Sequence, residues 1–476
     1  MAKVIIIGAG FSGQYAALVL QNALRGKGEH QITVINPHPM FTYIPSMIWV
    51  GIGQMQPEQA QFDLAPVYDK LGIEFIHGTA REVHPDDNYV MVERRGDGQM
   101  VRAGYDYLII ATGPHLNFAA TEGLGPEKGY TQSICSPPHA VATAKRYLEL
   151  VERLKKGDRA RIVIGTGHGA CTCQGAAFEY ISLVHNDLVD RGVRDRVDMR
   201  WVSNESAPGD FGIDGFEVRK GSMVFTSEDM FTAVFRDYGI EWAVRSHVQK
   251  VEEKTIYAEN DKGEIKEFAY DFAMLIPPFQ GQPIHYLDKD GNDLSGKLLN
   301  PARFFKVDGV YGKSYEDIHA GDWPRTYQNP DYQNIFAVGI AFAPPGCMSK
   351  PCSSPRGTPI SPAIPRTGYT SELTGKAAAL NVADMIEGRE PSHTASMAET
   401  AGMCVASMKN SWLKGSAAVI GIHPIVRNRF AFPETGGRNE NAGAVEMGLA
   451  GAWLKKGLHH AFLYKLSAKP MWQYIP

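Results

Sequence analysis

The chain has 476 residues, of which 44% are hydrophobic and 21% charged, which is enough for two or three domains with a sizeable core. A net charge of -4 gives no electrostatic reason to bind nucleic acid, and no apolar run is long enough for a membrane-spanning helix. Six cysteines are too few for a disulfide scaffold, which favours redox or catalytic use of the thiols. Because an apolar strand starts within the first few residues, we expect no signal peptide.

The N-terminus predicts a complete dinucleotide-binding unit. An apolar strand over residues 4–7 runs into a glycine-rich loop, a helical pattern and a second apolar strand over residues 32–35. In such a loop Gly8 permits the tight turn, Gly10 lets the backbone approach a pyrophosphate, and Gly13 lets helix and strand pack closely. The N-terminus of the helix favours the phosphates. The first helical turn adds two expected cofactor contacts, Phe11 and Ser12.

The residue at the end of the second strand departs from the usual pattern. Asn36 stands where an acidic residue usually binds the ribose hydroxyls of the dinucleotide. An asparagine can form a hydrogen bond to a hydroxyl without bringing charge. We therefore expect Asn36 to contact the ribose, and we count Pro45, in the segment that follows, among the cofactor contacts.

Two later segments favour FAD over NAD as the ligand of this unit. A strand ending in Ala111-Thr112-Gly113 resembles the second motif of two-domain, disulfide reductase-like flavoproteins. The segment ending at Gly339 resembles their third motif, although Ile340 replaces the usual aspartate. The order of the three motifs along the chain makes FAD the expected cofactor.

A second glycine-rich unit follows the strand over residues 161–164. Its next strand, over residues 197–202, leads into Glu205, which could act as the ribose-binding acid of an NADH site. The same unit carries Cys173 at the start of a helix, where the N-terminal dipole stabilises a thiolate. NADH binding and thiol chemistry both remain open for this unit.

The cysteine contexts resemble the sulfide:quinone oxidoreductase family. Cys173 lies six residues before Glu179, Cys135 lies four residues before His139, and Cys404 follows the Pro-Arg-Thr-Gly segment as the family's C-terminal cysteine does. An Ala-Pro-Pro sequence after the third flavin motif has the same form as in that family. The resemblance extends from about residue 8 to residue 464.

The resemblance implies an FAD enzyme that oxidises sulfide to sulfur or polysulfide and reduces a membrane quinone. Cys173 and Cys404 would carry the growing sulfur chain, with Cys135 as a third redox-active thiol. His139 is expected to move protons. Glu179 is either a proton relay or a solvated carboxylate on its helix.

The segment Pro365-Arg366-Thr367-Gly368 resembles the family's Pro-Lys-Thr-Gly, with arginine keeping the positive charge. Thr367 is a suitable N-cap, and we expect Arg366, Thr367 and Gly368 to direct the positive end of a helix at the flavin. The family's aromatic quinone clamp is poorly matched. Met403 and Trp412 are the expected quinone contacts.

Three further cysteines have no assigned role: Cys171, Cys347 and Cys352. The Cys347–Cys352 spacing is a poor zinc signature without other ligands nearby, and we expect no metal site.

The C-terminal segment predicts an amphipathic helix over residues 450–466. One face would carry the apolar residues Leu454, Leu458, Ala461, Phe462 and Leu466, and the other would carry Lys455, Lys456, His459 and His460. This composition suits a helix that lies in a membrane interface, and the family resemblance implies a monotopic anchor. Packing against a second copy of the chain is the alternative.

We therefore expect an α/β protein with two Rossmann-like domains and a C-terminal module with a membrane-binding helix. The FAD domain would be split between residues 1–118 and 297–390, the second Rossmann-like domain would cover 119–296, and the quinone-side module would cover 391–476. Sulfide, quinone and a membrane surface are the expected partners, and a homo-oligomer is compatible with the sequence. The sequence leaves open the identity of the quinone, the sulfur chain length, covalent attachment of FAD and the membrane face.

Three alternative functions remain. The first is a type II NADH:quinone oxidoreductase. The second is the flavin subunit of a flavocytochrome c-type sulfide dehydrogenase. The third is a non-catalytic flavin-binding sulfur carrier or sensor.

Overall fold

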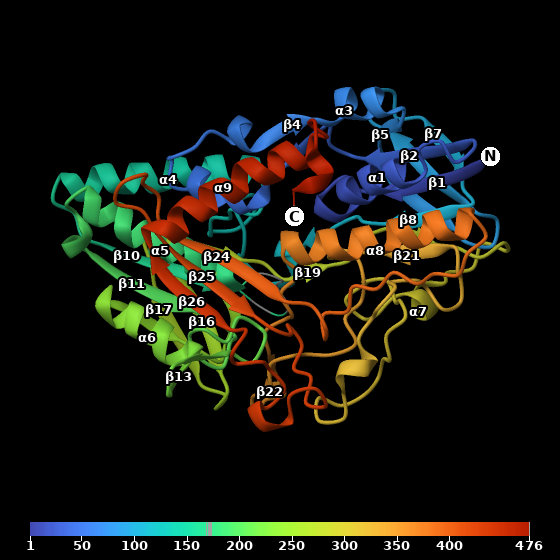
Figure 1. Ribbon diagram of the computed structural model, residues 1–476. Coiled ribbons are helices and arrows are strands. Elements are labelled where there is room, and N and C mark those ends of the chain that lie inside the picture. The colour runs from blue at the N-terminus through green and yellow to red at the C-terminus, as the bar shows by residue number, and fades with distance from the viewer. Residues whose placement is uncertain (168, 170–173, 476) are drawn as a thin grey trace.

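The protein forms two α/β lobes joined by a third, antiparallel sheet, as seen in a computed structural model that describes residues 1–167, 169 and 174–475. Figure 1 shows the N-terminal lobe with β1 and β2 on one side and the second lobe with β10 and β11 on the other. The third sheet and the long C-terminal helix α9 lie between and above them.

The first lobe is built on a sheet of order β21-β8-β1-β2-β5-β6-β7. Its parallel strands are β1 (Ala2–Ile7), β2 (His30–Asn36), β5 (Glu74–His84), β8 (Tyr107–Ile110) and β21 (Ile335–Ala337). Antiparallel β6 (Tyr89–Arg94) and β7 (Met100–Gly104) extend one edge. Successive residues of β1 from Val4 to Ile7 are all buried, which explains the continuous apolar run, because successive side chains point to opposite faces.

Two helices distant in sequence pack together on this sheet. They are α1 (Phe11–Ala23) and α8 (Gly368–Ile386). A Cβ atom on Gly375 of α8 would lie 2.4 Å from the backbone oxygen of Ser12, so only glycine permits this helix contact.

The second lobe has a parallel sheet of order β14-β11-β10-β18, and an antiparallel meander packs beside it. The sheet strands are β10 (Ala160–Thr166), β11 (Val197–Val202), β14 (Ile240–Ala243) and β18 (Phe272–Ile276); the meander is β15 (Ser246–Glu252), β16 (Thr255–Asn260) and β17 (Ile265–Ala269). Its helices are α4 (Pro137–Lys155), α5 (Gln174–Asp190) and α6 (Ser227–Asp237).

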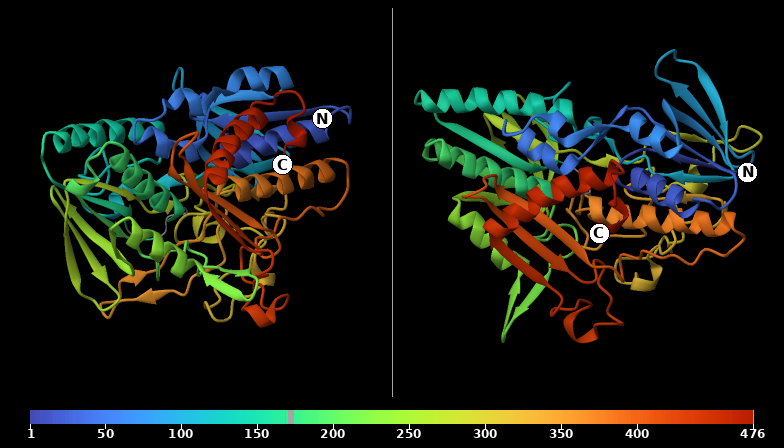
Figure 2. Two further views of the ribbon diagram at one scale, coloured as in Figure 1. Left: turned by 60° about the vertical axis from the view of Figure 1, so that its left-hand side comes forward. Right: turned by 45° about the horizontal axis from the view of Figure 1, so that its top comes forward.

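The third module consists of antiparallel β24 (Gly402–Lys409), β25 (Ser416–Ile422) and β26 (Ala444–Gly448), followed by α9 (Leu449–Leu466). Helix α5 contacts β10 on one side and β24 on the other, so it joins the second sheet to the third. Figure 2 shows α9 crossing from the third sheet to α1 of the first lobe.

Shorter elements complete the connections: β3 (Met40–Thr42), β4 (Gln61–Asp63), β9 (His115–Leu116), β12 (Glu217–Lys220), β13 (Met223–Thr226), β19 (Phe279–Gln280), β20 (His285–Tyr286), β22 (Cys352–Ser353), β23 (Pro359–Ile360), α2 (Met47–Val50), α3 (Leu64–Leu71) and α7 (Ser295–Leu298). Single turns of 3-10 helix are η1 (Ile44–Ser46), η2 (Pro57–Ala60), η3 (Phe118–Ala120), η4 (Arg194–Arg196), η5 (Ala320–Asp322), η6 (Pro433–Thr435) and η7 (Trp472–Tyr474).

The expected α/β class with two parallel-sheet lobes is confirmed. One domain boundary differs from the expectation, because β20 at residues 285–286 pairs with β5 of the first sheet. The chain therefore returns to the first lobe before residue 297. Among the described helices, none is both long and apolar enough to cross a bilayer.

Candidate active site at the junction of the lobes

The first glycine-rich loop shows which glycines the fold itself requires. Gly8 has a φ of +104°, and a Cβ atom there would lie 2.2 Å from the backbone oxygen of Ala111. A Cβ atom on Gly13 would lie 1.9 Å from the backbone oxygen of Gly8. A Cβ atom on Gly10 meets no described atom within 4 Å. Gly8 and Gly13 are therefore needed for packing, whereas Gly10 leaves open space where a phosphate could approach the backbone.

Helix α1 begins directly after this loop, at Phe11. Its N-cap residue Gly10 forms no side-chain capping bond, which leaves the first N–H groups of the helix available to an anion. Asn36 braces the loop, because its Oδ1 accepts a hydrogen bond from the Ala9 N–H at 3.0 Å. Its Nδ2 donates to the backbone oxygen of His38 at 2.7 Å, so one amide hydrogen is left for a ribose.

The later motifs converge on the same loop. Ala111 follows β8 and packs over Gly8, and Gly113 has a φ of +66°. A Cβ atom on Gly339 would lie 2.3 Å from Ser12 Oγ, and its N–H donates to Thr374 Oγ1 at 2.9 Å. Segments separated by more than 200 residues in sequence thus meet at the N-terminus of α1.

Arg366 supplies a buried positive charge beside the start of α8. It is 5% exposed, and its Nη1 donates to the backbone oxygens of Ile340 at 2.7 Å and Phe342 at 2.6 Å. Burial lowers the pKa of Arg366 to about 9. Within the described chain its Nε has no hydrogen-bond partner and no carboxylate pairs with it. A buried cation of this kind fits an anionic ligand.

The start of α8 also lies close to the glycine loop. Thr367 is the N-cap residue but forms no side-chain capping bond. A Cβ atom on Gly368 would lie 2.8 Å from the ring of Phe11. Pro45 lies in the turn η1 next to Tyr43, whose ring centroid is 5.6 Å from that of Phe11.

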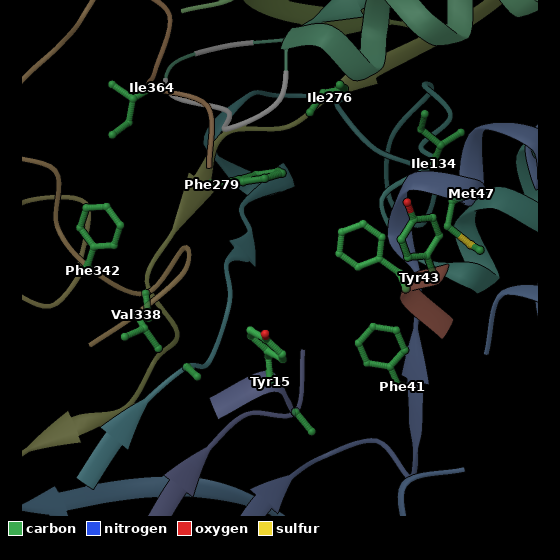
Figure 3. Packing of buried hydrophobic residues seen from close by; sticks show 14 of the residues in the cluster. Tyr15, Phe41, Tyr43, Met47, Ile134, Ile276, Phe279, Val338, Phe342 and Ile364 are labelled. Atoms are coloured by element: carbon green, nitrogen blue, oxygen red, sulfur yellow. The ribbon is translucent and has the colours of Figure 1, made fainter. Parts of the chain in front are cut away.

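Apolar side chains from both lobes surround the junction. Figure 3 shows Tyr15, Tyr43 and Val338 of the first lobe in the same region of the core as Phe279 and Ile276. All of them belong to one continuous hydrophobic cluster. The open space at Gly10 and the uncapped N-terminus of α1 lie in the first lobe, which therefore fits FAD.

The structure brings Cys404 to the start of α5. A Cβ atom on Gly175 would lie 4.0 Å from Cys404 Sγ and 3.9 Å from the ring of Phe211. Cys173 immediately precedes α5 in sequence but lies outside the described residues, as does Cys171. Cys404 is therefore beside the N-terminus of the helix that follows the predicted nucleophile in the chain.

Cys135 and His139 lie at the start of α4. The backbone N–H of Cys135 donates to Ser133 Oγ at 3.2 Å, and Cys135 packs against the main core. His139 Nε2 lies 3.7 Å from a carboxylate oxygen of the exposed Glu127, and its ring meets Phe118 edge-on at 5.6 Å. These contacts direct the His139 ring towards the Phe118 loop.

Glu179 is buried and paired with a lysine. Of the two roles expected for it, this excludes the solvated carboxylate on the helix surface. It is 7% exposed, and Lys455 Nζ of α9 lies 3.1 Å from both of its carboxylate oxygens. Burial raises the pKa of Glu179, while Lys455 and a backbone bond from Ser407 oppose the rise. A second buried pair, Glu372 and Lys465 at 2.7 Å, ties α8 to α9. Burial raises the pKa of Glu372 to about 7.

The expected division of the C-terminal helix into one apolar and one polar face is wrong. Lys455, His459 and Lys465 are buried together with Phe462 and Leu466, while Leu454 is 39% exposed. His459 Nδ1 lies 2.8 Å from Ser46 Oγ, and burial lowers the pKa of His459 to about 4, which keeps the ring neutral. The helix docks through buried cations because carboxylates on α5 and α8 receive them. Lys455 is the main site residue that the sequence analysis did not identify. The spacing of the lysines in this helix does not say whether Lys455 is buried or exposed.

The two expected quinone contacts lie far apart. Met403 is near the start of β24, and Trp412 lies beyond its end in the turn before β25. The strand from Met403 to Lys409 alone spans roughly 20 Å at about 3.3 Å per residue. A quinone ring could not touch both side chains.

The expected ribose-binding acid of the second glycine-rich unit is turned inward. Glu205 is completely buried, and its carboxylate accepts hydrogen bonds from Ser203 Oγ at 2.7 Å and from the Phe211 N–H at 2.6 Å. Burial and the charge of Asp210 raise the pKa of Glu205 to about 8. Asn204 Nδ2 donates to the Ser361 backbone oxygen at 2.9 Å, so a distant segment covers the end of this strand. Both carboxylate oxygens thus accept hydrogen bonds from protein donors.

Cys347 and Cys352, which have no assigned role, lie shortly before Ser361 in sequence. Cys352 Sγ donates to the Ile360 oxygen at 3.0 Å within the β22–β23 hairpin. Burial raises the pKa of the Cys347 thiol. No group of possible metal ligands occurs among the described residues.

Comparisons with known proteins agree with this geometry. Residues 2–200 match the family model described as pyridine nucleotide-disulphide oxidoreductase. The chain is 32% identical to the sulfide-quinone reductase of Aquifex aeolicus over 81% of this chain and 77% of the relative. The solved structure of the sulfide:quinone oxidoreductase from that bacterium covers 98% of this chain and 92% of its own, with a TM-score of 0.77 and 27% identity.

More distant relatives include NADH-using enzymes. An external alternative NAD(P)H-ubiquinone oxidoreductase of Arabidopsis thaliana is 24% identical over 71% of this chain and 57% of its own length. The NADH complex of NDH2 from Plasmodium falciparum has a TM-score of 0.62 at 14% identity, covering 100% of this chain and 99% of that one, which shows a shared fold.

Proposed function

The chain belongs to the sulfide:quinone oxidoreductase family, and we propose that it oxidises sulfide through Cys173 and Cys404 and passes the electrons by way of FAD to a membrane quinone. The observation that carries the assignment of the thiols is the position of Cys404 at the start of α5. The 32% identity to a sulfide-quinone reductase supports the reaction class.

The first lobe would hold FAD through its backbone more than through charged side chains. The N-terminus of α1 and the open space at Gly10 would receive the pyrophosphate, with Phe11 and Ser12 in the first turn and Asn36 near the ribose. Arg366 and the N-terminus of α8 would stabilise negative charge on the ring system. When bound, FAD accepts an electron pair from sulfur chemistry and delivers it to the quinone.

The reaction determines what the protein residues must supply. Hydrosulfide, a quinone and one proton give zero-valent sulfur and a quinol, so two electrons leave sulfur and the quinone gains two protons. The N-terminus of α5 favours anionic sulfur held near Cys404. Because sulfide itself brings one proton, a second one must enter from solvent.

Glu179 is the residue best placed to transfer protons on the side of α9. Its raised pKa and its contact with Lys455 give a buried pair whose protonation can change when a charge appears nearby. We assign Cys135 to the sulfur side as a third thiol and His139 to proton exchange with solvent, which its exposed partner Glu127 supports. The quinone ring itself would lie near Met403 or near Trp412, but not against both.

The test is anaerobic stopped-flow of the FAD-loaded protein, following the visible absorbance of the flavin. Sulfide should bleach the flavin and a soluble quinone should restore its absorbance. Cys173→Ala and Cys404→Ala should each abolish bleaching by sulfide, whereas Cys352→Ala should not. Bleaching by NADH alone would favour a type II NADH:quinone oxidoreductase. Sulfide binding without quinone turnover would favour a carrier or sensor, and reoxidation only by cytochrome c would favour a flavocytochrome-type subunit.

We further propose that the enzyme works at a membrane surface as a peripheral protein, because its quinone substrate is held in the bilayer. The exposed aromatic side chains of α9, Trp453 and Tyr464, support this placement.

A further inference from the structure

The start of α5 leaves an open space beside Cys404. Two small, half-buried residues, Gly175 and Ala176, follow the first residue of the helix. A Cβ atom on Gly175 would lie 4.0 Å from Cys404 Sγ and 3.9 Å from Cδ1 of the Phe211 ring. Among the described residues, no other atom outside this helix lies within 4 Å of that point. We call the space bounded by Cys404, Gly175 and Phe211 the sulfur compartment.

The Phe211 ring forms the wall of the sulfur compartment opposite Cys404. It meets the buried ring of Phe231 edge-on at a centroid distance of 4.8 Å and the buried ring of Phe178 edge-on at 6.2 Å. Edge-to-face pairs of this kind stabilise a fixed ring orientation. The wall is therefore held from behind by two further aromatic side chains.

The backbone beneath this ring is fixed by two buried carboxylates. Phe211 has a φ of +53°, and its N–H donates to a Glu205 carboxylate oxygen at 2.6 Å. The Asp210 carboxylate accepts the N–H groups of Gly212 at 3.1 Å and Asp214 at 3.2 Å. Because these bonds hold the backbone on both sides of Phe211, the position of the ring is set by the loop.

The size of the sulfur compartment limits what can be built on Cys404. Its Sγ and the edge of the Phe211 ring are at most about 8 Å apart, because they lie 4.0 Å and 3.9 Å from one point. Non-bonded atoms approach to about 3.5 Å, and an S–S bond is about 2.05 Å long. A chain that grows from Cys404 towards Phe211 therefore reaches the ring after roughly two added sulfur atoms.

We propose that Phe211 limits the length of the sulfur chain on Cys404, so that the enzyme releases a short hydropolysulfide anion. The proposal rests on the proposed function and names the class of product. In each growth step a hydrosulfide forms an S–S bond to the terminal sulfur of the chain and loses its proton. Two electrons pass by way of FAD to the quinone, which takes up that proton and one from solvent to give the quinol.

Release needs no further oxidant. A hydrosulfide attacks the chain sulfur that is bonded to Cys404 Sγ, a new S–S bond forms, and the bond to Sγ breaks. Cys404 leaves as a thiolate, which the N-terminus of α5 stabilises, and the attacking sulfur keeps its proton in the released hydropolysulfide. Once the chain meets Phe211, growth is blocked, whereas this attack at the other end of the chain is not.

The other reading of Phe211 is that it only fills the core. Its neighbours Phe178 and Phe231 do so and are almost completely buried, but Phe211 is partly exposed and its edge faces the Gly175 position. A core residue would change the stability of the protein without changing the product. The number of sulfur atoms in the chain separates the two readings.

The experiment is anaerobic turnover of the FAD-loaded protein with sulfide and a soluble quinone, stopped with an alkylating agent. Mass spectrometry then counts the sulfur atoms on the peptide that contains Cys404 and in the released, alkylated polysulfides. Phe211→Ala should lengthen both by at least about one sulfur atom, because the wall is removed. Gly175→Ala should shorten the chain on Cys404 by about one, since its Cβ atom enters the sulfur compartment at ordinary contact distances.

The matched control is Phe231→Leu, which loosens the same aromatic cluster behind the wall. Phe231 is completely buried, so this variant should be less stable, but its chain length should equal that of the unchanged protein. It should also retain flavin bleaching by sulfide. A shift in chain length that appears in Phe211→Ala and Gly175→Ala but not in Phe231→Leu would therefore belong to the wall itself.

Equal chain lengths in Phe211→Ala and the unchanged protein would overturn the proposal, as would much longer chains on Cys404 of the unchanged protein. The same lengthening in Phe231→Leu would overturn a specific role of Phe211. If Phe211→Ala does not fold, an unchanged chain length in Gly175→Ala overturns the limit by itself. Failure of sulfide to bleach the flavin of the unchanged protein would instead refute the proposed function.

Discussion

Replacing Glu205 by glutamine should change how the stability of the protein depends on pH. In the structure Glu205 is completely buried, with its carboxylate held by Ser203 Oγ and the Phe211 N–H. Phe211 has a φ of +53°, so its backbone is in the left-handed region and depends on this bond. The glutamine carbonyl oxygen can accept from the Phe211 N–H, and the glutamine amide can donate to the Ser203 hydroxyl oxygen.

The sign follows from the raised pKa. Glu205 has a pKa of about 8 in the folded protein against an ordinary value of 4.5, so folding takes up a proton between these two values. The stability that this group contributes is complete below about pH 4.5 and is lost as the pH rises through about 8. The difference corresponds to about 5 kcal/mol as an upper limit, at about 1.36 kcal/mol per pKa unit.

The assay is thermal unfolding of the FAD-loaded protein at several pH values and one scan rate. The difference in Tm, Glu205→Gln minus the unchanged protein, should increase by on the order of several degrees as the pH is raised from about 5 to about 8.5. Glu316→Gln, on the exposed surface, is the matched control and should show no such gain. A Tm difference that is constant across this pH range would refute the reasoning. If the substitution abolished a response of the flavin to NADH, Glu205 would be a ribose ligand after all.

Three further predictions concern the site. Gly10→Ala should fold normally but retain FAD poorly, because the added Cβ atom meets only the space for the ligand. Gly13→Ala should fail to fold, and measurements of flavin content and circular dichroism distinguish the two variants. Lys455→Met should destabilise the protein by about 3–5 kcal/mol in denaturation experiments, because it leaves Glu179 unpaired. Adding Glu179→Gln should restore much of the lost stability, and an equal loss in the single and double variants would show that the two side chains do not stabilise each other. Cys404→Ser should keep FAD but lose bleaching by sulfide, and retained bleaching would remove Cys404 from the mechanism.

The glycine motifs could be predicted from sequence because their requirements are local. A strand, a turn with positive φ and a helix N-terminus are specified by neighbouring residues, and the structure places Gly8, Gly13 and Gly339 as expected. The order of the three motifs along the chain favoured FAD, and in the fold they meet because parallel strands present their carboxyl ends at one edge of a sheet. The placement of Cys404 beside α5 agrees with the family resemblance, while Cys173 lies outside the described residues.

The contacts of α9 could not be predicted in the same way. Helical spacing distinguishes two faces of a helix but does not say which face is buried. The carboxylates that accept Lys455 and Lys465 lie 276 and 93 residues away in sequence, and only the fold brings them there. The separation of Met403 from Trp412 likewise depends on the length of β24.

The sequence by itself determined the fold class, the FAD-binding loops and the family, because these depend on short motifs whose backbone geometry is local. Only the tertiary structure decided that Glu205 is turned inward, that Glu179 is paired with Lys455, and that α9 buries Lys455 and Lys465 while Leu454 is exposed. The physical reason is that a charged side chain can be buried only where a distant partner offsets its desolvation, and that partner has no signal in the neighbouring sequence.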